Sequence, residues 1–269
     1  VEMDDQLEAI VKEVQKGSKY RHIHEDLVRN IAASEIKKGR SNKETIKAVR
    51  NKIHQVGSAY QPLGIDYNLL IAKLQTLPKD LLDPLVKEFC REAMALHAST
   101  RERLDILETF YSTCLASLTP IHSLLDIACG LNPLTLPWIP VRKDAKIFAC
   151  DIYTDQIDFL NQFFTYFNIQ GKAFCCDLTQ EIPAQETQIT FILKTIPCLE
   201  QIDKHIGQRL LSGIQSKYLL ISFPAQSLGG RDKGMRQFYG NHFQSLIGNQ
   251  DWSVQAYSFS SEEAYLVEK

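Results

Sequence analysis

The sequence predicts an α/β protein in which an all-α N-terminal region, residues 1–118, precedes a doubly wound parallel sheet within residues 119–269. Two observations indicate this division. After Pro120, five short apolar runs are separated by segments long enough for helices, which is typical of parallel strands joined by crossover helices. Before Pro120, apolar residues recur at helical spacing instead.

Helix signals follow one another through the N-terminal region. The first helix ends at Gly17-Ser18, and its apolar face consists of Leu7, Ile10, Val11 and Val14. Ser41 with Glu44 three residues later forms a capping box that begins another helix. Other helices are expected at about 26–39, 67–75, 85–97 and 100–118.

The stretch SLLDIACGLNPLTLP, residues 123–137, organises the second region. Its apolar run is typical of a buried parallel strand, and Gly130 and Asn132-Pro133 then turn the chain into a loop. In open α/β sheets, ligands bind beyond the carboxyl ends of the strands. A glycine there lets the backbone approach a ligand closely. We therefore expect a ligand loop at this point.

Two acidic residues end the next predicted strands, residues 146–151 and 172–177. Asp151 lies about 20 residues beyond the first loop, where nucleotide-binding sheets place a carboxylate that accepts both ribose hydroxyls. A helix cap is the ordinary alternative for Asp151 and for Asp177. Further strands are expected at 189–193, 218–223, 252–259 and 264–267.

Four strings give the sequence a specific resemblance. They are HASTRER (97–103), DIACGLNPLTLPW (126–138), LKTIPCLE (193–200) and ISFPAQSLGGRDKGM (221–235). The chain resembles the aminoglycoside-resistance 16S rRNA (guanine-N7)-methyltransferases from about Lys16 onward. The resemblance implies a class I methyltransferase with a Rossmann-like sheet and S-adenosyl-L-methionine as cofactor. It also implies methylation of N7 of a guanosine in the ribosomal decoding site, which opposes aminoglycoside binding.

The resemblance also implies a cofactor site. Asp151 is expected to hold the ribose, Asp177 the adenine edge, and Leu178 one face of the adenine. Arg103 offers a bidentate guanidinium for the methionine carboxylate, although a helix-surface arginine is the alternative. The other expected pocket residues are Tyr60, His97, Ser99, Ala128, Gly130 and Leu193.

Methylation at guanine N7 makes few chemical demands. N7 carries an in-plane lone pair and has no proton to lose, so no general base is expected, and catalysis rests on alignment and exclusion of water. No metal site is expected either. The seven cysteines are odd in number and form no C-x-x-C pair, so we expect buried free thiols.

A basic segment precedes the sheet. Residues 16–52 contain 11 basic and four acidic residues, a net charge of +7 in a chain whose total is −2. Such a cluster suits phosphate-backbone binding, with a solvated helical face as the alternative. The expected RNA contacts are Lys19, Arg21, Arg50 and Lys52, with Arg231, Lys233 and Met235 from a glycine-rich loop.

Two other functions remain open. Pro197-Cys198 suits a cytosine-C5 methyltransferase, in which a thiolate adds to the base, although a structural cysteine fits the same position. A non-catalytic RNA-binding or subunit-assembly factor on the same sheet is the other alternative. A nicotinamide oxidoreductase is disfavoured because G-x-G-x-x-G is absent after the first strand.

Composition indicates the expected location, and the resemblance implies the partner. Hydrophobic residues make up 44% of the chain and charged residues 23%, as in ordinary globular proteins. No apolar run reaches the roughly 20 residues of a membrane span. We expect a cytoplasmic monomer that acts on 16S rRNA within the assembled small (30S) ribosomal subunit.

Overall fold

The computed structural model describes residues 2–58, 64–225, 234–248 and 250–269. Its centre is a seven-stranded sheet of order β3-β2-β1-β4-β5-β7-β6, in which the first five strands run parallel and β7 is antiparallel to both neighbours. This confirms the predicted α/β fold. The strands are β1 (Ile121–Ile127), β2 (Val141–Asp151), β3 (Gln170–Cys175), β4 (Thr187–Leu193), β5 (Ser216–Pro224), β6 (Ser253–Ser258) and β7 (Glu262–Glu268).

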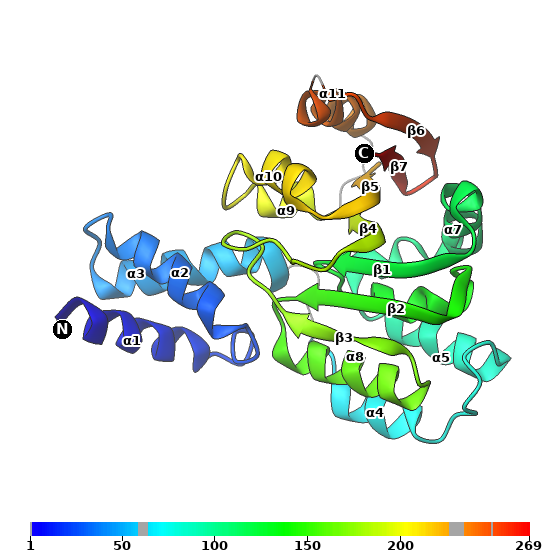
Figure 1. Cartoon of the computed structure of the whole chain (residues 1–269). Coiled ribbons are helices and arrows are strands. Elements are labelled where there is room, and N and C mark those ends of the chain that lie inside the picture. Colours follow the sequence, from blue (N-terminus) through cyan, green and yellow to red (C-terminus); the bar gives the residue numbers. More distant parts are fainter. Residues whose placement is uncertain (1, 59–63, 226–233, 249) are drawn as a thin grey trace.

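The first three helices form a lobe beside the sheet, which we call the N-terminal lobe. They are α1 (Glu2–Gln15), α2 (Glu25–Ile36) and α3 (Asn42–Ile53). Apolar side chains such as Val14, Val28 and Val49 fill its centre. The predicted capping box is present, because Ser41 and Glu44 each accept the other's backbone N–H. The carboxyl ends of β1, β2 and β3 point toward this lobe (Figure 1).

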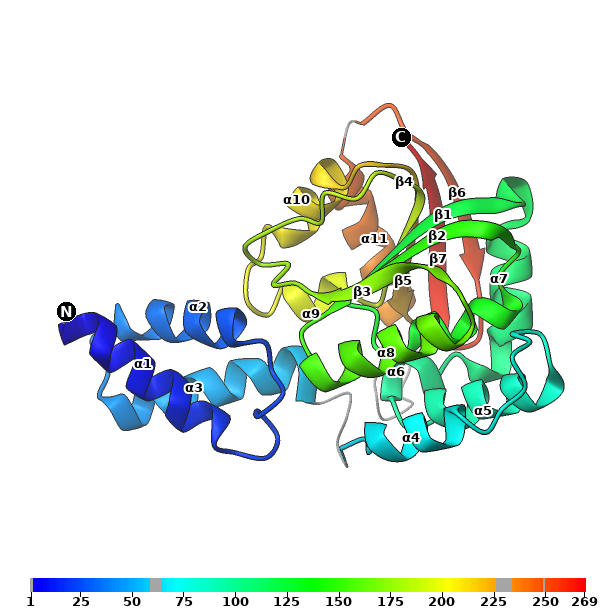
Figure 2. The ribbon, with the colours of Figure 1, turned by 60° about the horizontal axis from the view of Figure 1, so that its bottom comes forward.

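Helices cover both faces of the sheet. On one face lie α4 (Tyr67–Leu74), α5 (Pro84–Met94), α7 (Leu107–Cys114) and α8 (Thr154–Tyr166). On the other lie α10 (Ile206–Gly213) and α11 (Met235–Ile247). Two short helices, α6 (Ala98–Arg101) and α9 (Ile196–Leu199), lie near the strand ends. Figure 2 shows these layers and the N-terminal lobe set to one side.

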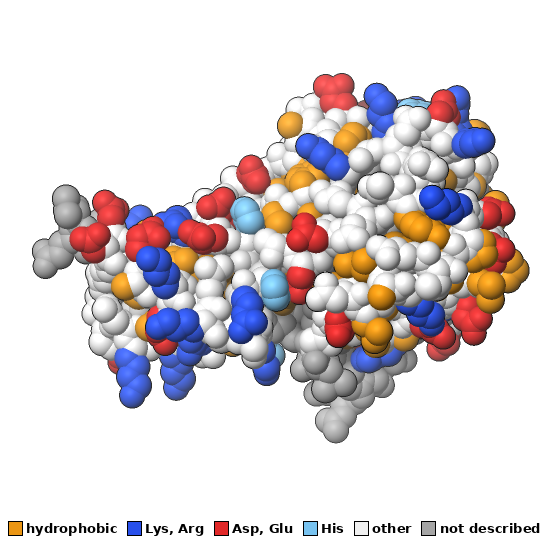
Figure 3. Space-filling model, turned by 90° about the horizontal axis from the view of Figure 1, so that it is seen from below, with side chains coloured by type: hydrophobic (Ala, Val, Ile, Leu, Met, Phe, Trp, Pro, Cys, Tyr) orange, Lys and Arg blue, Asp and Glu red, His pale blue; other side chains and the backbone are white. Residues whose placement is uncertain are grey.

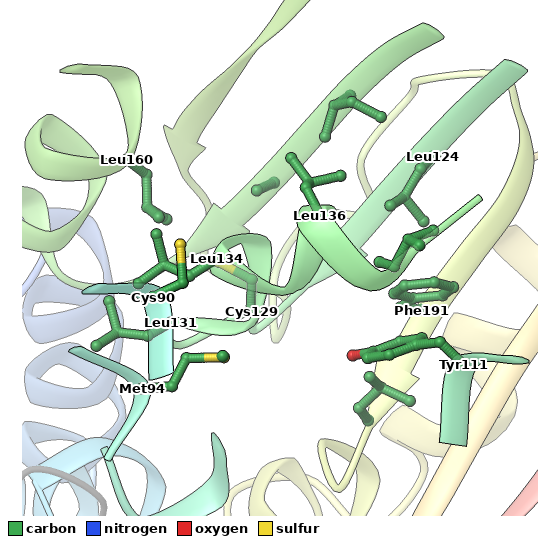
Figure 4. Close-up of a cluster of buried hydrophobic side chains, with 14 of the residues drawn as sticks. Cys90, Met94, Tyr111, Leu124, Cys129, Leu131, Leu134, Leu136, Leu160 and Phe191 are labelled. Atoms are coloured by element: carbon green, nitrogen blue, oxygen red, sulfur yellow. The ribbon is translucent and has the colours of Figure 1, made fainter. Parts of the chain in front are cut away.

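The core beneath β1 joins the sheet to helices that precede it in sequence. Cys90 and Met94 of α5 and Tyr111 of α7 are fully buried there (Figure 4). The Tyr111 ring stacks on Phe191 of β4, with ring centroids 5.9 Å apart. These helices therefore share one core with the strands. The domain boundary at residue 118 stays a prediction.

Two predicted helices differ from the structure. The helix expected at about 100–118 is divided into α6, a 3₁₀ turn at Leu104–Ile106, α7 and a second 3₁₀ turn at Ala116–Leu118. The helix expected at about 85–97 ends at Met94, and α6 begins separately at Ala98. The Thr100 hydroxyl donates to the Met94 carbonyl at 2.7 Å and to the His97 carbonyl at 3.1 Å. This side-chain bonding competes with a continuous helix.

Within the described residues, no helix is long and apolar enough to cross a membrane.

Candidate functional site

A pocket lies at the carboxyl ends of β1, β2 and β4, where the parallel strands open into loops. Its walls come from these loops, from the segment around α6 and from the N-terminal lobe. The structure brings together nine of the predicted cofactor residues as its lining, namely His97, Ser99, Arg103, Ala128, Gly130, Asp151, Asp177, Leu178 and Leu193. Tyr60 lies outside the described residues.

The loop after β1 is tied directly to Asp151. The Gly130 N–H donates to Asp151 Oδ2 at 2.8 Å, and the Ile152 N–H donates to Asp151 Oδ1 at 2.7 Å. Gly130 has φ +52°, and a Cβ built there would lie 2.8 Å from His97 Cε1. Only glycine fits this turn without strain. Burial raises the pKa of Asp151 and lowers that of His97 to about 4, so His97 is neutral near pH 7.

Asp177 is fixed by two different elements. Its Oδ1 accepts the Thr179 N–H at 3.0 Å and the Thr179 hydroxyl at 2.6 Å, while Oδ2 accepts the Asn30 side-chain amide at 3.0 Å. Leu178 beside it is 4% exposed and forms part of the wall. The carboxylate therefore holds a local turn and also lines the pocket.

Arg103 is buried, so the surface-arginine alternative is wrong. Its Nε and Nη2 donate to Glu262 at 2.7 and 2.9 Å, and Nη1 donates to Asn132 Oδ1 at 2.8 Å. Ser222 also donates to Glu262, at 2.6 Å. Among the described residues, these bonds leave one N–H on Nη1 and one on Nη2.

Several residues of this pocket escaped the sequence prediction. Lys194, with φ +56°, is 6% exposed, and its ammonium donates to the Ser99 carbonyl at 3.0 Å and to Glu102 at 2.8 Å. Asn132 links Arg103 to Asp126, donating to that carboxyl at 2.7 Å. Asn132 lay within a matched string, but nothing in the string marked it as a link. Asn30 and Glu262 carried no local signal at all.

Of the RNA contacts predicted in the N-terminal segment, two are exposed and two are bonded within the N-terminal lobe. Lys19 and Arg21 are exposed. Arg50 donates to the Glu13 carbonyl at 2.6 Å, and Lys52 pairs at 2.9 Å with the buried Glu35. In Figure 3, Lys and Arg side chains gather on one side of the N-terminal lobe and acidic ones toward the other.

The second predicted RNA contact region is mostly outside the described chain. Met235 is the first residue of α11, directly after Gly234 in the left-handed conformation. Arg231 and Lys233 lie outside the described residues. Cys198 is half-buried on the pocket wall, and its thiol donates to the Lys194 carbonyl at 3.3 Å.

Comparison with known families decides the identity of this sheet. The model of the ribosomal RNA methyltransferase (FmrO) family matches residues 16–267. The chain belongs to the FmrO family of ribosomal RNA methyltransferases. A relative from Serratia marcescens, a 16S rRNA (guanine(1405)-N(7))-methyltransferase, is 31% identical over 94% of each chain. An enzyme of the same name from Micromonospora rosea is 28% identical over 99% of this chain and 98% of its own.

Solved structures agree with this family assignment. The 16S rRNA methylase RmtB matches with a TM-score of 0.80 at 26% identity, covering 98% of both chains. The 16S rRNA methyltransferase RmtF, solved in complex with S-adenosyl-L-homocysteine, also matches with a TM-score of 0.80, at 27% identity over 98% of both chains. The FmrO-family fold thus extends over the N-terminal lobe as well as the sheet.

Proposed function

We propose that this chain transfers the methyl group of S-adenosylmethionine to N7 of a guanosine in the decoding site of 16S rRNA, and so confers aminoglycoside resistance. Family membership and likeness to guanine-N7 methyltransferases over nearly the full chain support this function. One observation carries this function. Asp151, Asp177 and the tight loop at Gly130 lie together in one pocket, at the carboxyl ends of neighbouring parallel strands.

The residues present fit this cofactor. Asp151 accepts one backbone N–H on each oxygen and a further bond from the Gln156 side chain, which leaves acceptor capacity for a ribose hydroxyl. Asp177 and Leu178 would hold the adenine edge and face, and the remaining N–H groups of Arg103 suit the methionine carboxylate. The bound cofactor supplies an electrophilic methyl group on a sulfonium.

The protein's contribution to the reaction is alignment. Guanine N7 has a lone pair and no proton to lose, so no side chain has to act as a base. Orienting the N7 lone pair in line with the methyl group and excluding water supply most of the rate enhancement. A guanosine within a helix must leave its stack to enter the pocket. The N7 methyl then adds bulk and positive charge where a cationic drug binds.

The assembled 30S subunit is the substrate that this architecture suits. The N-terminal lobe combines a net charge of +7 over residues 16–52 with exposed Lys19 and Arg21. Such a surface favours an extended face of folded RNA, recognised by shape and phosphate contacts. The chain would act as a monomer on ribosomal subunits in the cytoplasm.

Methyl transfer from labelled cofactor to purified 30S subunits tests this function. Borohydride–aniline cleavage after the reaction should cut 16S rRNA at a single decoding-site guanosine. Asp151→Ala should label at least tenfold less, because it removes the ribose acceptor and the Gly130 bond. Asp158→Ala, which changes an exposed acid of α8, is the matched control and should label normally. Absence of label in wild type would favour a non-catalytic RNA-binding factor.

A substitution of Cys198 distinguishes guanine-N7 from cytosine-C5 methylation, because the side chain of Cys198 lies on the pocket wall. Cys198→Ala should retain activity within about threefold, since the thiol would act only in packing. In a C5 mechanism the thiolate forms the covalent bond to the base, and the same variant would lose all turnover. The measurement is the initial rate of label transfer to 30S subunits.

A further inference from the structure

The N-terminal lobe holds the loop that carries Asp151. Ile23 forms a β-bridge with Tyr153, the His24 N–H donates to the Ile152 carbonyl at 2.7 Å, and the Thr154 N–H donates to the His22 carbonyl at 2.8 Å. These backbone bonds join the segment between α1 and α2 to the loop after β2. The N-terminal lobe is therefore bonded to the chain directly after Asp151, the residue that is predicted to hold the ribose.

The same lobe reaches the loop that carries Asp177. Asn30 lies on α2 and donates its side-chain amide to Asp177 Oδ2 at 3.0 Å, although 147 residues separate the two in sequence. One turn earlier on α2, Leu27 is 2% exposed and forms part of the pocket wall. Helix α2 thus supplies the apolar side chain of Leu27 to the pocket wall and bonds through Asn30 to Asp177, which also lines the pocket.

Close packing leaves this contact little freedom. Gly57, which follows α3, also lines the pocket, and a Cβ built on it would lie 2.7 Å from Tyr153 Oη. Thr179 holds one oxygen of Asp177 while Asn30 holds the other. With both oxygens fixed, the carboxylate cannot rotate about its Cβ–Cγ bond without losing a hydrogen bond.

We propose that Asn30 is a positioning residue of the cofactor site. Its amide orients the Asp177 carboxylate so that the remaining acceptor sites face the adenine amino group. The lobe that carries the basic surface thereby also shapes the pocket. The inference rests on the proposed function, because it takes S-adenosylmethionine as the ligand of this pocket.

Coupling between the two ligands follows from this arrangement. Bound RNA would restrain the N-terminal lobe, and the restraint passes through Asn30 and the Ile23–Tyr153 bridge to both cofactor loops. A ligand that orders these loops and one that orders the lobe should each tighten the binding of the other, by the same factor. S-adenosylhomocysteine should therefore increase affinity for 30S subunits.

Titration calorimetry with S-adenosylhomocysteine tests the role of Asn30. Asn30→Ala should bind about tenfold more weakly than wild type, because an unfixed carboxylate loses its alignment. Asn30→Asp should bind more weakly still, since two carboxylates then face each other. Asn51→Ala, which changes an exposed asparagine of α3, is the matched control and should bind normally.

A cofactor analogue distinguishes positioning from general damage. With purine in place of adenine, the ligand has no amino group for Asp177, so wild type and Asn30→Ala should bind it equally. The increase in 30S affinity caused by S-adenosylhomocysteine should also be smaller in Asn30→Ala, because one of the two links between the lobe and the cofactor loops is then lost. Equal affinity of wild type and variant for the natural ligand would overturn the inference, as would an equal loss with the analogue. Failure of wild type to bind S-adenosylhomocysteine would instead overturn the proposed function.

Discussion

A single asparagine connects buried polar side chains at the pocket wall. Asn132 donates to Asp126 at 2.7 Å, and its Oδ1 accepts from Arg103 at 2.8 Å and from the Tyr111 hydroxyl at 2.7 Å. All four side chains are buried. Burial raises the pKa of Asp126 to about 7, because its effect exceeds the opposing effects of the Asn132 hydrogen bond and the Arg103 charge. The carboxyl group therefore binds its proton more tightly in the folded protein than in the unfolded chain.

This raised pKa predicts a specific pH dependence. In the unfolded chain the Asp126 pKa lies near 3.9. The stabilisation from its bound proton is thus fully present below about pH 4 and is lost as the pH rises toward 7, at up to about 1.4 kcal/mol per pH unit. Asp126→Asn, which mimics the protonated form, should remove this slope. Urea unfolding between pH 4.5 and 8 measures it, and parallel curves for wild type and variant would refute the assignment.

At the scale of elements, β7 connects the sheet to the helical segment that precedes β1 in sequence. Glu262 begins β7, is fully buried and pairs through both oxygens with Arg103. The Arg103 guanidinium also lies over the Phe110 ring of α7, 5.0 Å from its centroid. Burial alone would raise the pKa of Glu262, but Arg103 and Lys194 outweigh it and hold that pKa below its usual value. Glu262 therefore stays ionised through the neutral range.

Removing this charge should destabilise the sheet and the helices packed on it. Glu262→Gln leaves the buried Arg103 without a counter-ion, and we expect a loss of about 3–5 kcal/mol in the free energy of unfolding. Glu268→Gln on the same strand is the matched control, because Glu268 pairs with the exposed Lys217 and should contribute nothing measurable. In wild type the contribution of Glu262 should persist until the pH falls through its lowered pKa. Equal midpoints of urea unfolding for both variants would contradict this.

Sequence patterns predicted the five parallel strands well, because each of them contains an apolar run that ends at an acid or a turn. Asp151 and Asp177 could be placed near each other for the same reason, since carboxyl ends of parallel strands share one edge of the sheet. Residues such as Asn30 and Glu262 could not be predicted. Their partners lie 147 and 159 residues away, and no local spacing records such a contact.

At the scale of the molecule, charge is distributed unevenly. The basic segment 16–52 carries +7 within a chain of net charge −2. Arg50 and Lys52 already bond within the N-terminal lobe, whereas Lys19 and Arg21 are exposed. Polyelectrolyte theory connects each phosphate contact to released counter-ions, so the salt dependence of binding counts such contacts.

Binding to 30S subunits should therefore weaken steeply as salt rises. Lys19→Ala and Arg21→Ala should each reduce the slope of log affinity against log salt by about one. Lys217→Ala, which removes an exposed cation of β5, is the control and should leave the slope unchanged. Filter binding at 50–300 mM potassium chloride measures all four proteins. A flat response in wild type would exclude phosphate contacts as the source of affinity.

The position of β7 has a consequence for how the chain is made. β7 follows the other six strands of this sheet in sequence and is synthesised after them, yet it lies inside the sheet between β5 and β6. Until residues 262–268 have been added, the edge of β5 lacks its partner strand β7, and Arg103 lacks the Glu262 carboxylate. Translation that stops before residue 262 therefore leaves a buried cation and an unpaired strand edge, a product suited to rapid proteolysis rather than to partial function.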